Sequence, residues 1–389
     1  MQVPVTLETA SLIHPRPRHP FQKMSRLIRP KKRTAGWKIF VTVLVGWVPL
    51  VVLTAVSGLH GSLVALLKDY RVFARVFIAV PLLLAGQTLI DERFRLIVQH
   101  FSDAGLLKAE DSPKFHSILA TIRRLKEAWF PKLLLVTFGC VAGILFVGNH
   151  LMFDAPWSVR FLASSFSQSS AGWYFELVTQ TIYMVLLGLA MWEWLLYVLF
   201  FGWVAQLQLQ LVACDPDQSG GLGFLGYSLT AFVPVIIAAS TAMGSVLCYQ
   251  VPHSVFSRAS LNTVLGLWVA VMLLVFVGPL AIFARKLALL HRLGCLEYGS
   301  LAHLHAEQFH EKWINERGGH MGELLAAREI MALNNLAVSF DRLRKISPLP
   351  IDKITLIEVI AAAAVPMLPA ILTQVPLTEL LRVIFRALF

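Results

Sequence analysis

The stretch LVTQTIYMVLLGLAMWEWLLYVLFFGWV, from Leu177 to Val204, decides the fold class of this 389-residue chain. Its only charged side chain is Glu193, and it is longer than the roughly 20 apolar residues that an α-helix needs to cross a bilayer core. An apolar run of this length is typical of a helix that lies in lipid. We therefore predict a transmembrane helix here.

The composition extends this prediction to the whole chain. Apolar residues make up 57% of it, charged residues only 15%, and the mean hydropathy is +0.67, far from the values of soluble domains. We predict an all-α, polytopic membrane helical bundle of about seven transmembrane helices with cytoplasmic amphipathic helices. The other six predicted spans are Ile39–Leu59, Val72–Ile90, Leu133–Phe153, Leu222–Tyr249, Thr263–Ala284 and Ile354–Leu372.

Charge predicts the orientation of the bundle. Most of the 34 lysines and arginines lie in three segments, 16–38, 93–132 and 285–353. Short loops rich in these residues stay cytoplasmic, so we expect a cytoplasmic N-terminus and an external or periplasmic C-terminus in the cell (inner) membrane. The net charge of +11 then fits a lipid bilayer with anionic lipid at the cytoplasmic face, and no nucleic acid partner is expected.

The predicted organisation has four parts. Residues 1–36 form a basic cytoplasmic tail, and residues 37–284 form the membrane bundle, which includes six spans and a cytoplasmic helix near 112–130. Residues 285–350 form a cytoplasmic helical segment, with one pattern around Leu301–Ile314. Residues 351–389 hold the seventh, proline-broken span and an outer interfacial helix. The cytoplasmic helices either pack against their own spans, lie on the inner membrane surface, or mediate assembly into a homo-oligomer.

The segment DPDQSGGLGFLG, residues 215–226, matches two short motifs at once. It lacks the strand of a dinucleotide-binding loop, and its twelfth position is Gly226 rather than the glutamate of a calcium loop. We predict a tight cytoplasmic turn in which Asp217 or Ser219 caps the fifth span. The alternative is an ion or headgroup site formed by Asp215, Asp217 and the backbone amides at Gly220 and Gly221.

Ionisable groups inside spans are costly, so they are candidates for a transport pathway. Glu193 and Glu358 both fall in the cytoplasmic halves of their spans and could line one vestibule, with Gln87 as a further polar candidate. Glu193 also lies in an aromatic belt, where it would reach the interface without a transport role. Arg75 is one turn from the start of its span, and we expect it to extend outward to the interface.

No familiar enzyme motif is present, so no catalytic residue is predicted. Glu307 and His310 form one E-x-x-H pair, but a carboxylate di-metal bundle needs two such pairs. We therefore expect neither a metal nor a cofactor.

Two stretches resemble a family of uncharacterised multi-pass bacterial inner-membrane proteins. Its members carry a PD-x-x-GGLGFL stretch and an LPxxLTxxPLxELL-like run, which this chain has at 216–225 and 368–381. Aspartate and glutamine stand at 215 and 374, where relatives often have histidine and methionine. The resemblance implies a multi-pass membrane protein and carries over no activity.

Two functions remain open from the sequence. In the first, the bundle is an ion channel or transporter-like protein, because intramembrane carboxylates and a broken helix are features of transport paths. In the second, it is a membrane-anchored scaffold or regulatory assembly protein with a cytoplasmic helical layer. The sequence favours the first weakly, and an embedded enzyme comes third.

Overall fold

The computed structural model describes residues 32–57, 62–148, 157–162, 165–253, 258–311 and 328–372. Two sequence predictions therefore lie outside the described residues: most of the basic tail, and the outer interfacial helix after Pro376.

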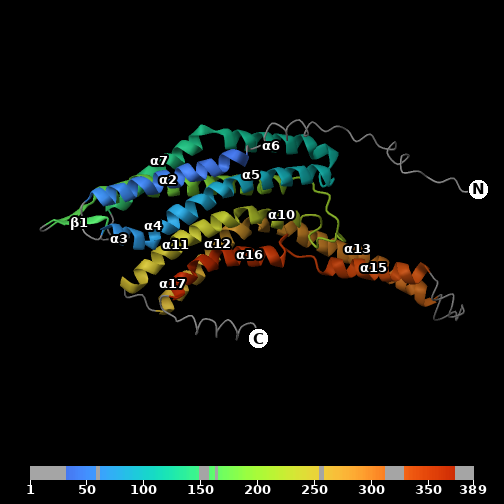
Figure 1. Ribbon diagram of the computed structural model, residues 1–389. Coiled ribbons are helices and arrows are strands. Elements are labelled where there is room, and N and C mark those ends of the chain that lie inside the picture. The colour runs from blue at the N-terminus through green and yellow to red at the C-terminus, as the bar shows by residue number, and fades with distance from the viewer. Residues whose placement is uncertain are drawn as a thin grey trace, which may run out of the picture.

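The described chain forms an all-α bundle in two layers, as predicted (Figure 1). Six of its helices are long and apolar enough to cross a membrane, and α7 lies where the third span was predicted, although its described apolar stretch, Trp129–Val141, is shorter. One layer holds α2 (Lys32–Val56), α5 (Val80–Asp103), α7 (Trp129–Gly148) and α9 (Thr181–Val204), and the other holds α11 (Val233–His253), α12 (Arg258–Val277) and α16 (Lys353–Ala364).

Short segments of other helical types interrupt most of the long helices. Two are π-helical, η2 (Ala74–Ala79) before α5 and η4 (Phe175–Gln180) before α9. The other three are 3-10 turns: η5 (Leu229–Phe232), η6 (Gly278–Phe283) and η8 (Val365–Met367). Prolines explain η6 and η8, because a proline has no backbone N–H for the α-helical pattern. The short α-helices α4 (Tyr70–Phe73), α8 (Ser170–Tyr174), α10 (Phe224–Ser228) and α17 (Leu368–Leu372) adjoin these segments.

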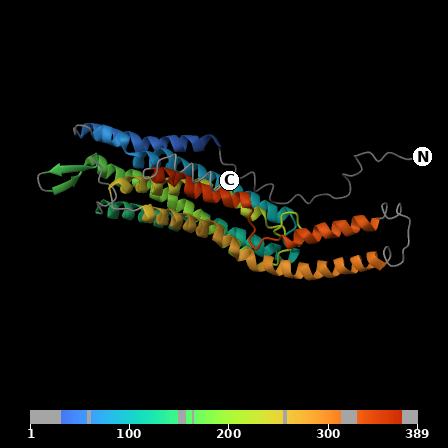
Figure 2. The ribbon, with the colours of Figure 1, turned by 90° about the horizontal axis from the view of Figure 1, so that it is seen from below.

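The two ends of the bundle differ in structure (Figure 2). At one end lie the short helix α3 (Ser62–Lys68) and an antiparallel hairpin of β1 (Val159–Leu162) and β2 (Ser165–Gln168), with Val159 opposite Gln168. At the other end lie α13 (Ala284–His310) and α15 (Arg328–Arg344), which pack side by side and extend away from the bundle. Under the predicted orientation, the first end is external and the second is cytoplasmic.

The helix α6 (Ser112–Glu127) packs against its own bundle rather than standing apart. It follows the short 3-10 turn η3 (Ala109–Asp111) and lies along α9, with Phe115 and Ile122 buried. The Phe115 ring contacts the rings of Phe101 and Phe200, from α5 and α9. Of the three arrangements predicted for the amphipathic helices, α6 therefore has the first, packing against neighbouring helices of the bundle; its predicted cytoplasmic location stays a prediction.

The sixth span has no break at the predicted boundary after Ala284. Only the 3-10 turn η6 separates α12 from α13, so the helix of the sixth span continues directly into the segment that follows it. The described part of the helix predicted around Leu301–Ile314 belongs to α13, which ends its α-helical range at His310. The change from apolar to polar residues at 284 therefore does not coincide with a helix end, because a helix can continue beyond the point where lipid ends.

Candidate functional site

The loop 205–223 is organised around one carboxylate. Asp217 Oδ1 accepts hydrogen bonds from the backbone N–H groups of Ser219 (2.9 Å) and Gly221 (3.0 Å), and its Oδ2 accepts one from Gly223 (2.7 Å). Gly220 and Gly221 have φ values of +64° and +93°, which L side chains rarely adopt. The loop is therefore a tight turn held by Asp217, as the sequence predicted. The predicted capping of the next helix by Asp217 or Ser219 was wrong: the N-cap residue of α10 is Gly223, which no side chain caps, because the Asp217 carboxylate binds N–H groups of the loop that precede the helix.

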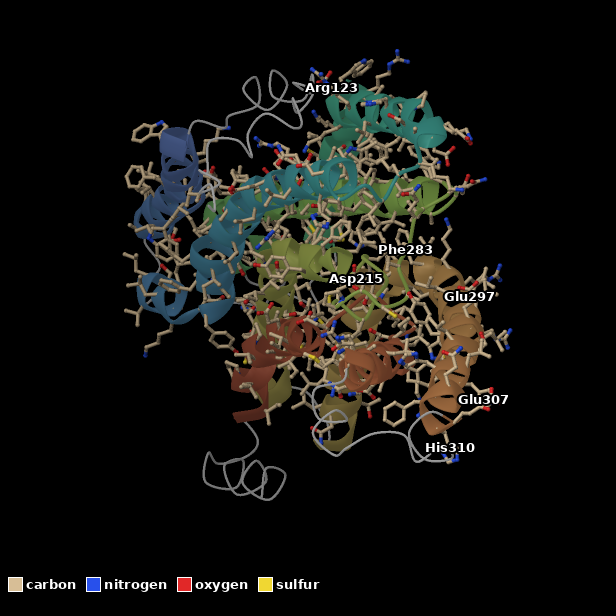
Figure 3. The ribbon with its side chains drawn as sticks, turned by 90° about the vertical axis from the view of Figure 1, so that its right-hand side faces the viewer. Arg123, Asp215, Phe283, Glu297, Glu307 and His310 are labelled. Carbon is tan, nitrogen blue, oxygen red and sulfur yellow. The ribbon has the colours of Figure 1, made fainter. Side chains whose placement is uncertain are left out.

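The same geometry weakens the alternative of a headgroup site at these amides. The amides of Gly221 and Gly223 already bind the Asp217 carboxylate, so they do not face an anion. Asp215 accepts from the Asp217 N–H at 3.0 Å, and burial raises the pKa of its carboxyl group above the ordinary value. Figure 3 shows Asp215 in the middle of this end, while Glu307 and His310 lie at the far part of α13.

A pocket of about 580 Å³ lies beside this turn. Asp215, Asp217, Gly220 and Gly221 line it together with residues at the end of α5, including His100. All four predicted loop residues therefore meet at one concave surface. A role for this surface in binding stays a prediction.

Replacing Asp217 by alanine is expected to lower the free energy of unfolding by about 1–3 kcal/mol, because three backbone donors lose a charged acceptor. Asp217→Asn should retain part of the stability, since one amide oxygen still accepts. Unfolding in detergent micelles measures both, with the exposed Asp103→Ala as the matched control. Equal stability of Asp217→Ala and Asp103→Ala would contradict the assigned role.

This loop also joins α13 and the segment after α15 to the bundle. The N–H of Ser347, which follows α15, donates to the Gln218 carbonyl at 3.0 Å, and the Lys286 ammonium on α13 donates to the Leu207 carbonyl. Asp111 accepts from the N–H of Gln208 at 2.8 Å. The pKa of Asp111 is held below its usual value, first by the hydrogen bond and ion pair with Lys114 and then by the bond from Gln208.

The predicted pathway residues lie in different surroundings. Glu193 is half-buried on α9, and its Oε2 has no hydrogen-bond partner among the described residues. The charges of Asp91 and Lys126, which form an ion pair, both interact electrostatically with its carboxyl group. Gln87 on α5 is half-buried. Glu358 on α16 is exposed on the side of the bundle. A pathway role for each stays a prediction, but the structure gives no support for one vestibule shared by Glu193 and Glu358.

Arg75 does not extend outward, so that prediction was wrong. Its side chain is 5% exposed and lies in η2, in electrostatic contact with Glu176 in η4 and with Tyr183 on α9. Glu176 is 2% exposed, and Gln180, one turn along the same helix, is 3% exposed. Arg75 turns inward because a buried carboxylate from another helix offers it an opposite charge.

A buried ion pair lies near Arg75, toward the end of the bundle that holds the β1–β2 hairpin. Asp69 binds Arg71 through two bonds, from Nε at 3.0 Å and from the terminal guanidinium nitrogen at 2.9 Å. The Asp69 carboxylate also accepts from the indole N–H of Trp157 at 3.0 Å, and the Arg71 guanidinium lies 3.5 Å from the ring centre of Tyr249. These contacts join α4, α11 and the segment before β1.

Sequence reasoning missed Asp69, Arg71 and Glu176. All three lie within three residues of the apolar runs used to define the spans, so they were assigned to loops. The signal that could have found them is the helical spacing of four between Arg71 and Arg75, which places both on one face.

Among the described residues, no group of three or more histidine, cysteine or acidic side chains is placed to hold a metal ion. Comparison of the chain with protein-family models, curated proteins and solved structures finds no match. The resemblance to an uncharacterised membrane family therefore stays a prediction, and the function has to be argued from the structure.

Proposed function

We propose that this integral membrane protein transports ions, as a channel or a transporter, and that Glu176 and Glu193 are its ion-handling groups. One observation carries the proposal. Both carboxylates have an oxygen that is buried and has no hydrogen-bond partner among the described residues, and both lie on the same continuous helix, Ser170–Val204.

The energetic cost of this arrangement supports a functional role. A carboxylate kept away from water costs several kcal/mol unless its oxygens are paired, and inside membranes such groups mark ion or proton pathways. Glu176 and Glu193 are 17 residues apart, which is roughly 25 Å along a helix and close to the thickness of a bilayer core. Their separation therefore suits two carboxylates placed near the two ends of one ion pathway.

The local helix geometry at Glu176 also supports a functional role for this residue. Arg75 and Glu176 both lie in π-helical segments, which are rare and are found frequently at functional sites. A π-helical segment has one more residue per hydrogen-bonded turn than an α-helix, so it can return to α-helix and rotate the side chains that precede it. This is a means of changing the contact between Arg75 and Glu176 during transport.

The test is ion flux in liposomes that contain the purified protein. We expect flux above that of empty vesicles for the wild type and a fall of at least about tenfold in Glu176→Gln, because the neutral amide can neither exchange a proton nor attract a cation. Glu193→Gln should reduce flux as well.

Glu358→Gln is the matched control, since it makes the same chemical change on an exposed face of α16. It should leave the flux unchanged. Absence of flux for protons, monovalent cations and small anions would reject the proposal, and flux that survives both Glu176→Gln and Glu193→Gln would remove the two carboxylates from it.

The orientation is part of the same proposal. With α6, the loop 205–223, α13 and α15 in the cytoplasm, the basic segments contact anionic lipid in the inner leaflet of the cell membrane. Cysteine labelling from one side of sealed vesicles tests this: Cys214 and Cys295, both partly accessible, should react only from the cytoplasmic side.

A scaffold is the second candidate function, and the surface of α13 favours it. Several leucines on this helix are exposed although it extends beyond the membrane-crossing part: Leu289, Leu293, Leu296, Leu301 and Leu304. An exposed apolar surface outside lipid is a feature of interaction sites. Loss of a bound partner protein after mutation of these leucines, with no ion flux in liposomes, would favour the scaffold over transport.

A further inference from the structure

Two buried acceptor atoms belong to side chains about one turn apart on η4. Glu176 Oε2 and Gln180 Oε1 are both removed from water, and neither has a hydrogen-bond partner among the described residues. Their residues are four positions apart, the spacing that brings side chains of one helix together. Since an ionised carboxylate and an amide oxygen are both acceptors, no hydrogen bond can form between these two atoms without an added proton.

A single proton on Glu176 changes this situation. The carboxylic acid O–H becomes a donor, and Gln180 Oε1 is an acceptor one turn away on the same helix. Two buried groups that were both unsatisfied then satisfy one another, and the buried negative charge disappears. Each change lowers the cost of keeping these groups away from water.

Positive charges near Glu176 stabilise its ionised form, which competes with the protonated form. Arg75 and Arg71 both interact electrostatically with Glu176. Arg75 also interacts with Asp69 and with Tyr183 on α9. Apart from α8 and α9, which continue η4 at its two ends, the helices that pack most extensively on η4 among the described residues are α2 and α7. Their apolar parts, 39–56 and 133–148, contain no charged side chain and only one weakly acidic group, the exposed Cys140. The ionised form of Glu176 is therefore stabilised mainly by Arg75.

We propose that Glu176 is a proton-operated switch, which pairs with Arg75 when ionised and donates a hydrogen bond to Gln180 Oε1 when protonated. The proton comes from water at one end of the bundle and returns to water, so one O–H bond forms and later breaks with no other reactant. This deepens the proposed function, on which it rests for its biological use, by making the proton the transported or coupled ion.

Infrared difference spectroscopy between acidic and alkaline buffer tests the switch without any transport measurement. In the wild type we expect a C=O stretching band of a buried carboxylic acid at acidic pH that shifts in heavy water. Glu176→Gln should lack this band, and Glu176→Asp should restore it. In Gln180→Leu, the band should move to higher frequency because its hydrogen bond is lost. Glu358→Gln should leave it unchanged.

Each outcome separates the switch from the proposed function. Identical spectra for the wild type and Glu176→Gln overturn the switch, even if the protein transports ions. That result is expected if the Gln180 amide N–H₂ donates to a permanently ionised Glu176. A band that is unaffected in Gln180→Leu removes Gln180 from the switch. A band that behaves as expected in a protein without flux supports the switch and rejects ion transport.

Discussion

Replacing Arg71 by alanine is expected to lower the free energy of unfolding by about 3–5 kcal/mol, because the substitution leaves a buried carboxylate without its cation. Arg71 is 1% exposed and Asp69 is 8% exposed, so water cannot replace the lost charge. The same guanidinium packs on the Tyr249 ring, so its removal also loosens the contact between α4 and α11.

Denaturant unfolding in mixed micelles measures this effect. The control is Arg123→Ala, which removes a bond of the same length, 2.9 Å to Glu127, on an exposed face of α6. Such a surface pair contributes about 0.3–0.5 kcal/mol. If both substitutions cost the same, the buried pair has no special role.

A double-mutant cycle with Asp69→Asn and Arg71→Met isolates the pair itself. The double variant should be more stable than the sum of the two single losses predicts, because it removes both charges together. Strict additivity of the two losses would contradict a direct interaction between these side chains in solution.

Replacing Gly226 by alanine is the second substitution with a large expected effect, a loss of about 1–3 kcal/mol in the free energy of unfolding. An added Cβ would lie against the Pro350 carbonyl oxygen and 2.7 Å from Ile351 Cα. Both are backbone atoms, so no change of side-chain rotamer relieves the contact. The segment between α15 and α16 would have to move away from α10.

Gly266→Ala is the matched control, because it makes the same change within α12 where no heavy atom lies within 4 Å of the new Cβ. Its stability should stay the same or rise by up to about 1 kcal/mol, since alanine favours the helix. Thermal unfolding in detergent compares the two variants. A Gly226→Ala protein as stable as Gly266→Ala would show that the 350–351 backbone does not pack closely against Gly226 in α10.

The candidate residues were predictable from the sequence where the physical reason is local. Asp217 holds a turn through N–H groups two to six residues away, so its role follows from the order of residues. Glu193 was predictable because it is the only charge in a long apolar run. Glu358 met the same criterion and is nevertheless exposed, since hydropathy does not tell which side of a helix faces its neighbours.

The buried pair of Arg75 and Glu176 could not be derived in this way. The two residues are about a hundred positions apart, and each lies near the end of its apolar run, where charged residues ordinarily reach water or lipid headgroups. Only the packing of η2 and η4 in one bundle removes both side chains from water.

The sequence by itself determined that the chain is a bundle of membrane helices, because the apolar length of each segment is set by bilayer thickness and the backbone bonds of a helix are satisfied within it. It also determined the turn at Asp217, whose donors are local. The tertiary structure alone decided which charges are buried, that α13 continues directly from the sixth span, and that Glu176 and Gln180 lie away from water. Burial depends on which helices pack together, and the sequence of one helix does not determine its neighbours.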